Sequence, residues 1–198
     1  MATGAFVGSM VAGFLGTFIA GGSPQGISPL NIERLVDQSG MIFAGKVIGV
    51  ETGRKDQMNL YVTYYTFEVT DALFGVETDT VRIKQYGGEA DGRSFYPEGV
   101  PRFKIGEELL VMLYPPSKVG MTSTVGKGQG KFLIQDDDSS RIKQVANAFN
   151  NKGLFRRLRY PGTVADESWA AEQPTGPLGY EAFVETIRDL IITLKKKR

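Results

Sequence analysis

Two residue types are absent from this chain of 198 residues, which has no cysteine and no histidine. Without cysteine there is no disulfide framework, no thiol nucleophile and no thiolate ligand for a metal. Without histidine the chain lacks the commonest general base and the commonest ligand of transition metals. Catalysis would depend on Asp, Glu, Lys, Tyr or Ser alone. We therefore expect a protein that is not an enzyme, with no catalytic residues, no metal site and no cofactor.

A strong net charge is also missing, because 23 Lys and Arg stand against 22 Asp and Glu. Residues 33–140 carry 12 basic and 16 acidic side chains, whereas residues 141–198 carry 11 basic and 6 acidic ones. The aromatic stretch "YVTYYTF" would suit base stacking, but a net negative central part repels phosphate, so we expect no nucleic-acid partner. The basic C-terminal part suits contacts with a second subunit, with another protein or with anionic envelope polymers.

No charged side chain occurs before Glu33, and the first 22 residues form a distinct apolar segment. Its stretch "GAFVGSMVAGFLGTFIAGG" repeats two small residues, then Phe or Met, then an aliphatic residue, with a period of four. The run from Ala5 to Ala20 matches the h-region of a secretory signal and is shorter than the roughly 20 residues of a membrane-spanning helix. It lacks the basic residue expected before an h-region. We expect an extracytoplasmic protein, secreted or at the cell surface.

The same segment is a candidate surface for self-association. As a strand it alternates small and large residues on both faces, and as a helix its small residues form a column that lets two backbones approach. We expect a homo-oligomer, with membrane contact only during export or through this segment. Whether residues 1–22 are a signal, an anchor or an assembly segment, and whether they form a helix or a strand, stays open. The residues expected at the contact are Gly4, Phe6, Gly8, Gly13, Phe14, Gly16 and Phe18.

After a Gly/Ser/Pro-rich linker at residues 23–30, residues 31–153 predict a mainly β (α+β) fold. Ser28 and Pro29 suit the start of a helix from Leu30 to Gln38. Five to seven short antiparallel strands at this spacing predict a small OB-like barrel, with a bulge or bend at Gly45 and one shared core. The strands are expected at residues 41–51, 60–73, 79–86, 106–116, 120–125 and 130–135, the last two joined by a turn at "GKGQG". The expected core residues are Ile42, Val47, Phe67, Val69, Val81, Ile83, Leu110 and Met112.

Two helices and a long loop are expected in the C-terminal part. The stretch "DDDSSRIKQVANAFNNKG" places Ile142, Val145, Ala146 and Phe149 at helical spacing behind an Asp/Ser cap. Residues 154–178 are expected to form a long loop. Residues 179–198 predict a helix that packs on the barrel through Phe183, Val184, Ile187, Leu190, Ile191 and Leu194.

Four stretches of the chain carry a resemblance to a known family. They are "LVDQSGMIFAGKVIGVETG", "YVTYYTFEVTDALFG", "VRIKQYGGE" and "PRFKIGEELLVMLY", which together span roughly residues 31–114. In this order they resemble bacterial exported proteins of unknown function with a netrin-like module, an OB-type barrel shared with tissue inhibitors of metalloproteinases. The resemblance implies a fold and an exported location. Those inhibitors act through an N-terminal cysteine, so this chain cannot inhibit by that route.

Two groups of acids remain as candidate sites. Asp136, Asp137 and Asp138 offer oxygen ligands to a divalent cation, although helix capping explains adjacent acids as well. Glu89, Asp91, Glu107 and Glu108 could supply a carboxylate pair for hydrolysis, although solvated loop acids are the plainer interpretation.

Three functions follow from these patterns. The leading one is an exported, non-enzymatic β-barrel module that self-associates through its N-terminal apolar segment, as a surface or filament subunit. The alternative is a secreted monomeric module that binds a protein or ligand and has its signal peptide removed. A carboxylate-based hydrolase comes third.

Overall fold

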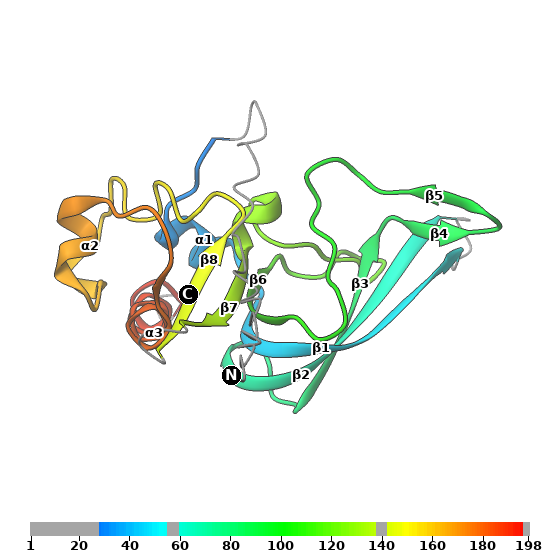
Figure 1. The fold of residues 1–198 in the computed structure, drawn as a ribbon, viewed down its shortest axis with the longest axis horizontal. Coiled ribbons are helices and arrows are strands. Elements are labelled where there is room, and N and C mark those ends of the chain that lie inside the picture. The colour runs from blue at the N-terminus through cyan, green and yellow to red at the C-terminus, as the bar shows by residue number, and fades with distance from the viewer. Residues whose placement is uncertain (1–27, 55–59, 138–141, 196–198) are drawn as a thin grey trace, which may run out of the picture.

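The computed structural model describes residues 28–54, 60–137 and 142–195, and this part of the chain is mainly β (Figure 1). The strands are β1 (Met41–Arg54), β2 (Tyr61–Phe74), β3 (Thr80–Tyr86), β4 (Gly88–Ala90), β5 (Arg93–Phe95), β6 (Glu108–Leu113), β7 (Lys131–Asp136), β8 (Lys143–Asn147) and β9 (Leu178–Gly179). The α-helices are α1 (Ile32–Gln38), α2 (Glu167–Glu172) and α3 (Tyr180–Lys195), and two short 3₁₀ turns lie at Lys127–Gly130 and Pro161–Thr163.

Seven strands form one antiparallel sheet in the order β3-β2-β1-β6-β7-β8-β9, and β4 and β5 form a separate hairpin. The long strands β1 and β2 pair from Ile42–Phe74 to Arg54–Tyr61, and β6 pairs with β1 only over Met41–Lys46. The register shifts between Ala44 and Gly45, as expected for a bulge at this glycine. A Cβ at Gly45 would collide with the Glu68 carbonyl oxygen, so only glycine fits there.

The sheet separates two apolar cores, because successive side chains of a strand point to opposite faces. On β1, Ile42 and Ala44 belong to the first core, which also contains residues of α1 and α3, whereas Phe43 and Val47 belong to the second. The expectation of one shared core is therefore wrong. Of the expected members, Ile42, Leu110 and Met112 lie in the first core; Val47, Phe67 and Ile83 lie in the second, with Val69 and Val81 packed against it.

The sheet has two edges, β3 and β9. Within the described residues no ladder joins these two strands, so the closed OB-like barrel stays a prediction. The stretch Gly120–Val125 forms only isolated bridges, Lys84 with Met121 and Leu113 with Thr124, instead of the expected strand. The expected hairpin turn at "GKGQG" is a 3₁₀ turn that leads into β7.

Helix α1 begins two residues later than expected, because Asn31 is its N-cap instead of Ser28. The Asn31 Oδ1 atom accepts a hydrogen bond from the Arg34 backbone N–H at 3.0 Å. Glu33 in its first turn is buried, and its Oε1 accepts hydrogen bonds from the backbone N–H groups of Arg159 and Tyr160, each at 2.7 Å. This carboxylate ties the residues around 160 to α1.

The helix expected within residues 136–153 is wrong. Lys143–Asn147 form strand β8 instead, and Asn147 and Asn151 then close a turn by exchanging backbone-to-side-chain hydrogen bonds at 3.0 Å. Asn150 and Asn151 have positive φ angles, which asparagine tolerates better than most residues. Asparagine side chains compete with helical hydrogen bonds, and this competition outweighs the helical spacing of Val145 and Phe149.

The segment at residues 154–178 is packed and partly helical, and is not a loop throughout. It contains α2, whose N-cap Asp166 accepts a hydrogen bond from the Ser168 N–H at 3.0 Å. Leu154, Phe155, Val164 and Trp169 from this segment are buried in the first core. The segment therefore extends the core beyond the edge of the sheet.

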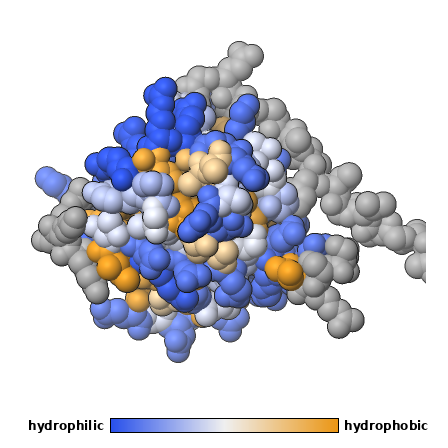
Figure 2. All heavy atoms as spheres, turned by 90° about the vertical axis from the view of Figure 1, so that its left-hand side faces the viewer, coloured by the Kyte–Doolittle hydropathy of each residue, from blue (hydrophilic) through white to orange (hydrophobic). Residues whose placement is uncertain are grey.

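Helix α3 covers the first core with one face. Phe183, Val184, Ile187 and Leu190 are buried, and Ile191 and Leu194 pack against the same core. Hydrophilic residues surround separate small apolar patches at this end of the molecule (Figure 2). This mixed surface fits a helix whose apolar face is turned inward.

Candidate functional site

The expected self-association residues, Gly4 to Phe18, lie outside the described residues, as do the rest of residues 1–22. In the part of the chain that the structure describes, no helix is long and apolar enough to cross a membrane. Self-association through this segment therefore stays a prediction from the sequence pattern.

The four candidate carboxylates are on two different parts of the fold. Glu89 is on β4 and accepts a hydrogen bond from the Tyr96 hydroxyl at 3.1 Å, and Asp91 is in the β4–β5 turn. Glu107 pairs with Lys131 at 2.7 Å, and Glu108 pairs with Lys143 at 3.4 Å. The structure does not place a Glu89–Glu108 pair in one cavity among the described residues, since each lines a different one.

Of the acids considered for a cation, Asp138 lies outside the described residues. Asp136 ends β7, and the Asp137 carboxylate accepts a hydrogen bond from Gln144 Nε2 at 3.3 Å. Within residues 28–54, 60–137 and 142–195, no group of three or more acidic side chains is placed to hold a metal ion.

A charged cavity of about 480 Å³ is lined by residues of β1, β2, β6, β7 and β8 and by the start of α3. Its acids include Asp71, which is paired with Arg188 at 2.8 Å, and Glu108. Burial, followed by the nearby charges of Asp71 and Glu181, raises the pKa of Tyr180 to about 12. The Tyr180 hydroxyl therefore stays protonated near neutral pH and can donate a hydrogen bond, but it cannot act as a base.

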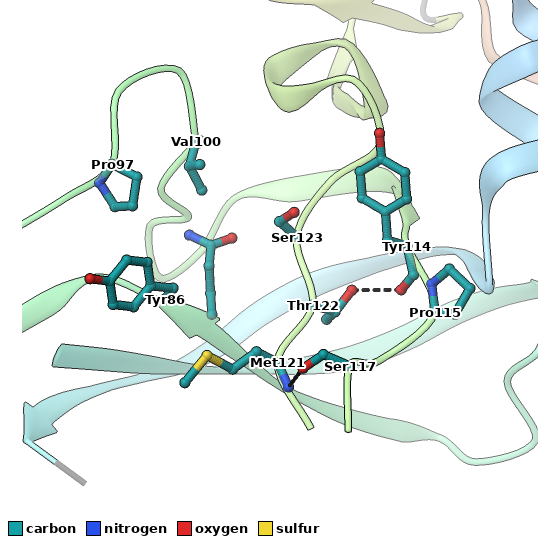
Figure 3. A pocket seen from close by; sticks show the side chains of 10 residues that line it. Tyr86, Pro97, Val100, Tyr114, Pro115, Ser117, Met121, Thr122 and Ser123 are labelled. Carbon is teal, nitrogen blue, oxygen red and sulfur yellow. Dashed lines mark hydrogen bonds between the residues drawn. The ribbon is translucent and has the colours of Figure 1, made fainter. Parts of the chain in front are cut away.

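A second cavity, of about 420 Å³, lies beside the end of β3 and is lined by uncharged side chains (Figure 3). Tyr86 comes from β3, Pro97 and Val100 from the loop after β5, and Met121 from the segment that bridges to Lys84. The remaining lining residues are Gln85, Tyr114, Pro115, Ser117, Thr122 and Ser123. We call this space the Gln85 cavity.

Gln85 is the unusual residue of this cavity. It is 3% exposed, sits opposite buried Thr63 in the β2–β3 ladder, and its Nε2 donates to the Pro101 carbonyl at 3.0 Å. Its Oε1 is shielded from solvent and has no hydrogen-bond donor among the described residues. A buried amide oxygen without a hydrogen-bond donor lowers the stability of the folded state by about 1–3 kcal/mol.

The other polar groups of the cavity are hydroxyls. Thr122 Oγ1 donates to the Tyr114 carbonyl at 2.6 Å, and Ser117 Oγ accepts from the Met121 N–H at 3.1 Å (Figure 3). The bond to Met121 leaves the Ser117 hydroxyl hydrogen available to a ligand. The cavity therefore combines apolar walls with a few uncharged polar groups, the usual composition of a small-molecule or side-chain pocket.

An exposed aromatic pair adjoins the cavity. The rings of Tyr86 and Phe95 lie 5.3 Å apart with an interplanar angle of 49°, and the two residues are 39% and 44% exposed. Large exposed aromatic side chains beside a pocket favour an interaction surface.

The sequence interpretation missed the Gln85 cavity, although one signal was present. Val81, Ile83 and Gln85 occupy alternate positions of the strand, so an inward-facing polar residue follows two inward-facing apolar ones. The walls come from the loops around Pro97 and Ser117, whose positions no periodic pattern predicts.

Comparison of the chain with models of protein families, with curated proteins and with solved structures finds no match. A function therefore has to be argued from the geometry of the Gln85 cavity and from the sequence.

Proposed function

We propose that this protein is an exported binding module without enzymatic activity, and that the Gln85 cavity is its binding site. The observation that carries the proposal is the buried Gln85 Oε1, an acceptor in the cavity wall that no donor of the described residues reaches. A ligand that brings an N–H or O–H group into the cavity would satisfy this acceptor once a side chain of the wall moves aside, and it would recover stability that the free protein lacks.

The size and lining of the cavity support the same proposal. Its volume of about 420 Å³ lies within the range of pockets that hold small ligands or side chains, roughly 300–1,000 Å³. The proline and tyrosine side chains of the wall have few rotatable bonds, so the protein loses little conformational entropy when a ligand binds.

Catalysis is not part of the proposed function, because the acidic and hydroxyl side chains considered for it are poorly suited to act as a base or a nucleophile. Glu107 and Glu108 are in ion pairs, and the Tyr180 hydroxyl has a pKa of about 12. The chain has no histidine or cysteine to add a base or a nucleophile.

Export and an OB-type closure of the sheet belong to the same proposal. Export is supported by the apolar run from Ala5 to Ala20. The OB-type, netrin-like arrangement is supported by the resemblance over residues 31–114 and by the antiparallel meander of β1, β2 and β3.

The binding proposal can be tested with the protein's own methionines. In protein labelled at the methyl groups of its six methionines, Met121 reports on the cavity, and buried Met112 reports on the core. The panel comprises N-acetylated amino-acid amides, neutral sugars and small alcohols. We expect at least one of these classes to shift the Met121 signal saturably while the Met112 signal stays unchanged.

Two matched substitutions complete this test. Val100→Trp fills the cavity and should abolish the Met121 response, whereas Val119→Trp adds the same bulk at an exposed residue that does not line the cavity. A panel without any saturable Met121 shift, or equal loss in both variants, would contradict the proposal.

A second candidate function is self-association through residues 1–22. It is favoured by the alternation of small and large residues on both faces of this segment when it is a strand. Such alternation would fix the pairing register when the segment adds to the sheet edge of a neighbouring subunit. A heterologous contact of this kind that does not close on itself builds a fibre, in keeping with a surface or filament subunit.

Gly13→Leu separates self-association from export. The substitution keeps the segment apolar, so export should continue, but the added side chain should collide with the partner and weaken assembly. Leu15→Ile, which adds no volume, is the matched control. Light scattering and electron microscopy of the exported protein measure assembly, and equal assembly of the Gly13→Leu variant and the parent would show that the small residues have no packing role.

A further inference from the structure

We propose that the occupant of the Gln85 cavity is the indole ring of a tryptophan side chain on a partner protein. The inference rests on the proposed binding function and names the ligand for the same site. Three features of the cavity lead to it, namely its acceptor, its walls and its lack of charge, and the position of this chain's own tryptophan identifies the kind of partner.

The acceptor requires an occupant with a hydrogen-bond donor. Gln85 Nε2 donates to the Pro101 carbonyl, whereas Oε1 has no donor among the described residues, so Oε1 is the atom of this amide that a ligand would satisfy. An indole N–H is a donor only, and it leaves no lone pair that a largely apolar cavity would have to satisfy.

The walls require a flat apolar body. Pro97, Val100 and Pro115 present rigid or branched aliphatic surfaces, and Tyr86 presents a ring. An indole buries roughly 150–250 Å² and fits offset against an aromatic neighbour. Because Oε1 is shielded from solvent, a side chain of the wall has to move as the ring enters, and unbranched Met121 is the wall residue best able to do so.

The lack of charge excludes most free metabolites. All ten lining side chains are uncharged, so the ammonium and carboxylate of a free amino acid, or the phosphates of a nucleotide, would enter without a counter-charge. Two cations near the cavity are engaged with other groups: Lys84 Nζ donates to the Val119 carbonyl at 3.3 Å, and Arg102 lies 4.6 Å from the Tyr96 ring centre. A tryptophan within a polypeptide has neutral amides in place of those charges.

The partner is a different protein. The chain has one tryptophan, Trp169, which is 7% exposed and lies 5.1 Å from the Phe155 ring in the first core. A second copy could not donate this ring without opening its own core. The exposed Tyr86–Phe95 pair provides a surface beside the cavity for residues that flank the partner's tryptophan.

The test compares two ligands that differ only at the indole nitrogen. N-acetyl-tryptophanamide and its 1-methyl derivative are titrated into the full chain, with the Met121 methyl signal as the measurement. We expect the N–H ligand to bind about three- to tenfold more tightly, the effect of one net hydrogen bond. In Gln85→Leu the preference should disappear, because the acceptor is gone while the shape of the wall is largely kept.

Each outcome has a distinct meaning. A preference that persists in Gln85→Leu would show that the methyl group acts by steric exclusion, and it would overturn the indole assignment. Sugars or alcohols that shift the Met121 signal when N-acetyl-tryptophanamide does not, or N-acetyl-tyrosinamide that binds more tightly, would overturn it and leave the binding function standing. If no ligand shifts the Met121 signal, both the indole assignment and the binding function are overturned. If Gln85→Leu loses its cooperative melt, Gln85→Met serves as the second variant, and the preference for the N–H ligand should disappear in it for the same reason.

Discussion

Replacing Phe67 with alanine should lower the free energy of unfolding by about 3–5 kcal/mol, the usual cost of removing a fully buried ring. Phe67 is fully buried at the centre of the second core. Its ring meets Phe43 at 5.4 Å and Phe103 at 5.3 Å, both edge to face. Phe43 belongs to β1 and Phe103 to the loop before β6, so the substitution opens a cavity between three separate segments.

Denaturant melts of Phe67→Ala and Phe95→Ala provide the measurement. Phe95 is 44% exposed, so the same chemical change there should cost about 1 kcal/mol or less. The midpoint should fall strongly for Phe67→Ala with little change in the slope of the transition. Equal midpoints for the two variants would show that the second core does not lie where the structure places it.

The strands were accessible to sequence reasoning because their alternation is strong. Residues Tyr61–Phe74 are rich in β-branched and aromatic residues, and β2 occupies this stretch. The continuous apolar run Leu109–Leu113 predicted a central strand, and all five residues are fully buried. Mainly β structure with flanking helices is therefore confirmed.

The division into two cores could not be predicted in the same way. Alternation assigns residues of one strand to two faces, but it does not say which face of one strand matches which face of the next. Leu110 and Phe67 were expected together, and the ladder through β1 places them on opposite sides of the sheet. Register between strands depends on bulges such as the one at Gly45, which shift pairing by one residue.

The Gln85 cavity was also beyond the sequence, for a different physical reason. Its walls at residues 97–100 and 114–123 are irregular segments held by turn and loop hydrogen bonds, such as the Thr122 N–H donating to the Lys84 carbonyl at 2.9 Å. The sequence pattern indicates only one part of the site, the polar residue Gln85 at an inward-facing position of β3.

The helix predicted around Val145 is wrong for another reason. The side chains of Asn147 and Asn151 accept the backbone hydrogen bonds of the turn that follows β8.

Helix α3 should be essential to the first core, and Ile187→Asp should lower the free energy of unfolding by at least about 3–5 kcal/mol. Ile187 is fully buried among residues of α1 and the sheet, so a carboxylate there would lose its hydration without gaining a partner. Neighbouring contacts fix the helix in place: the rings of Phe183 and Phe132 lie 4.9 Å apart, and Lys195 Nζ donates to the Ser39 carbonyl at 2.8 Å. The helix therefore cannot turn the new charge toward water without breaking them.

Ile192→Asp is the matched control, since it makes the same change on the same helix at a residue that is 52% exposed. An acid near the C-terminal end of a helix costs about 0.3–1 kcal/mol through the helix dipole, so the control should lose little more than that. We expect Ile187→Asp to lose its cooperative heat transition and near-ultraviolet circular dichroism and to bind a hydrophobic dye, because the core that α3 covers becomes exposed. We expect Ile192→Asp to keep all three properties of the parent. If the two variants melt together, the first core does not depend on α3, and its stability must come from α1 and the packed segment at residues 154–178.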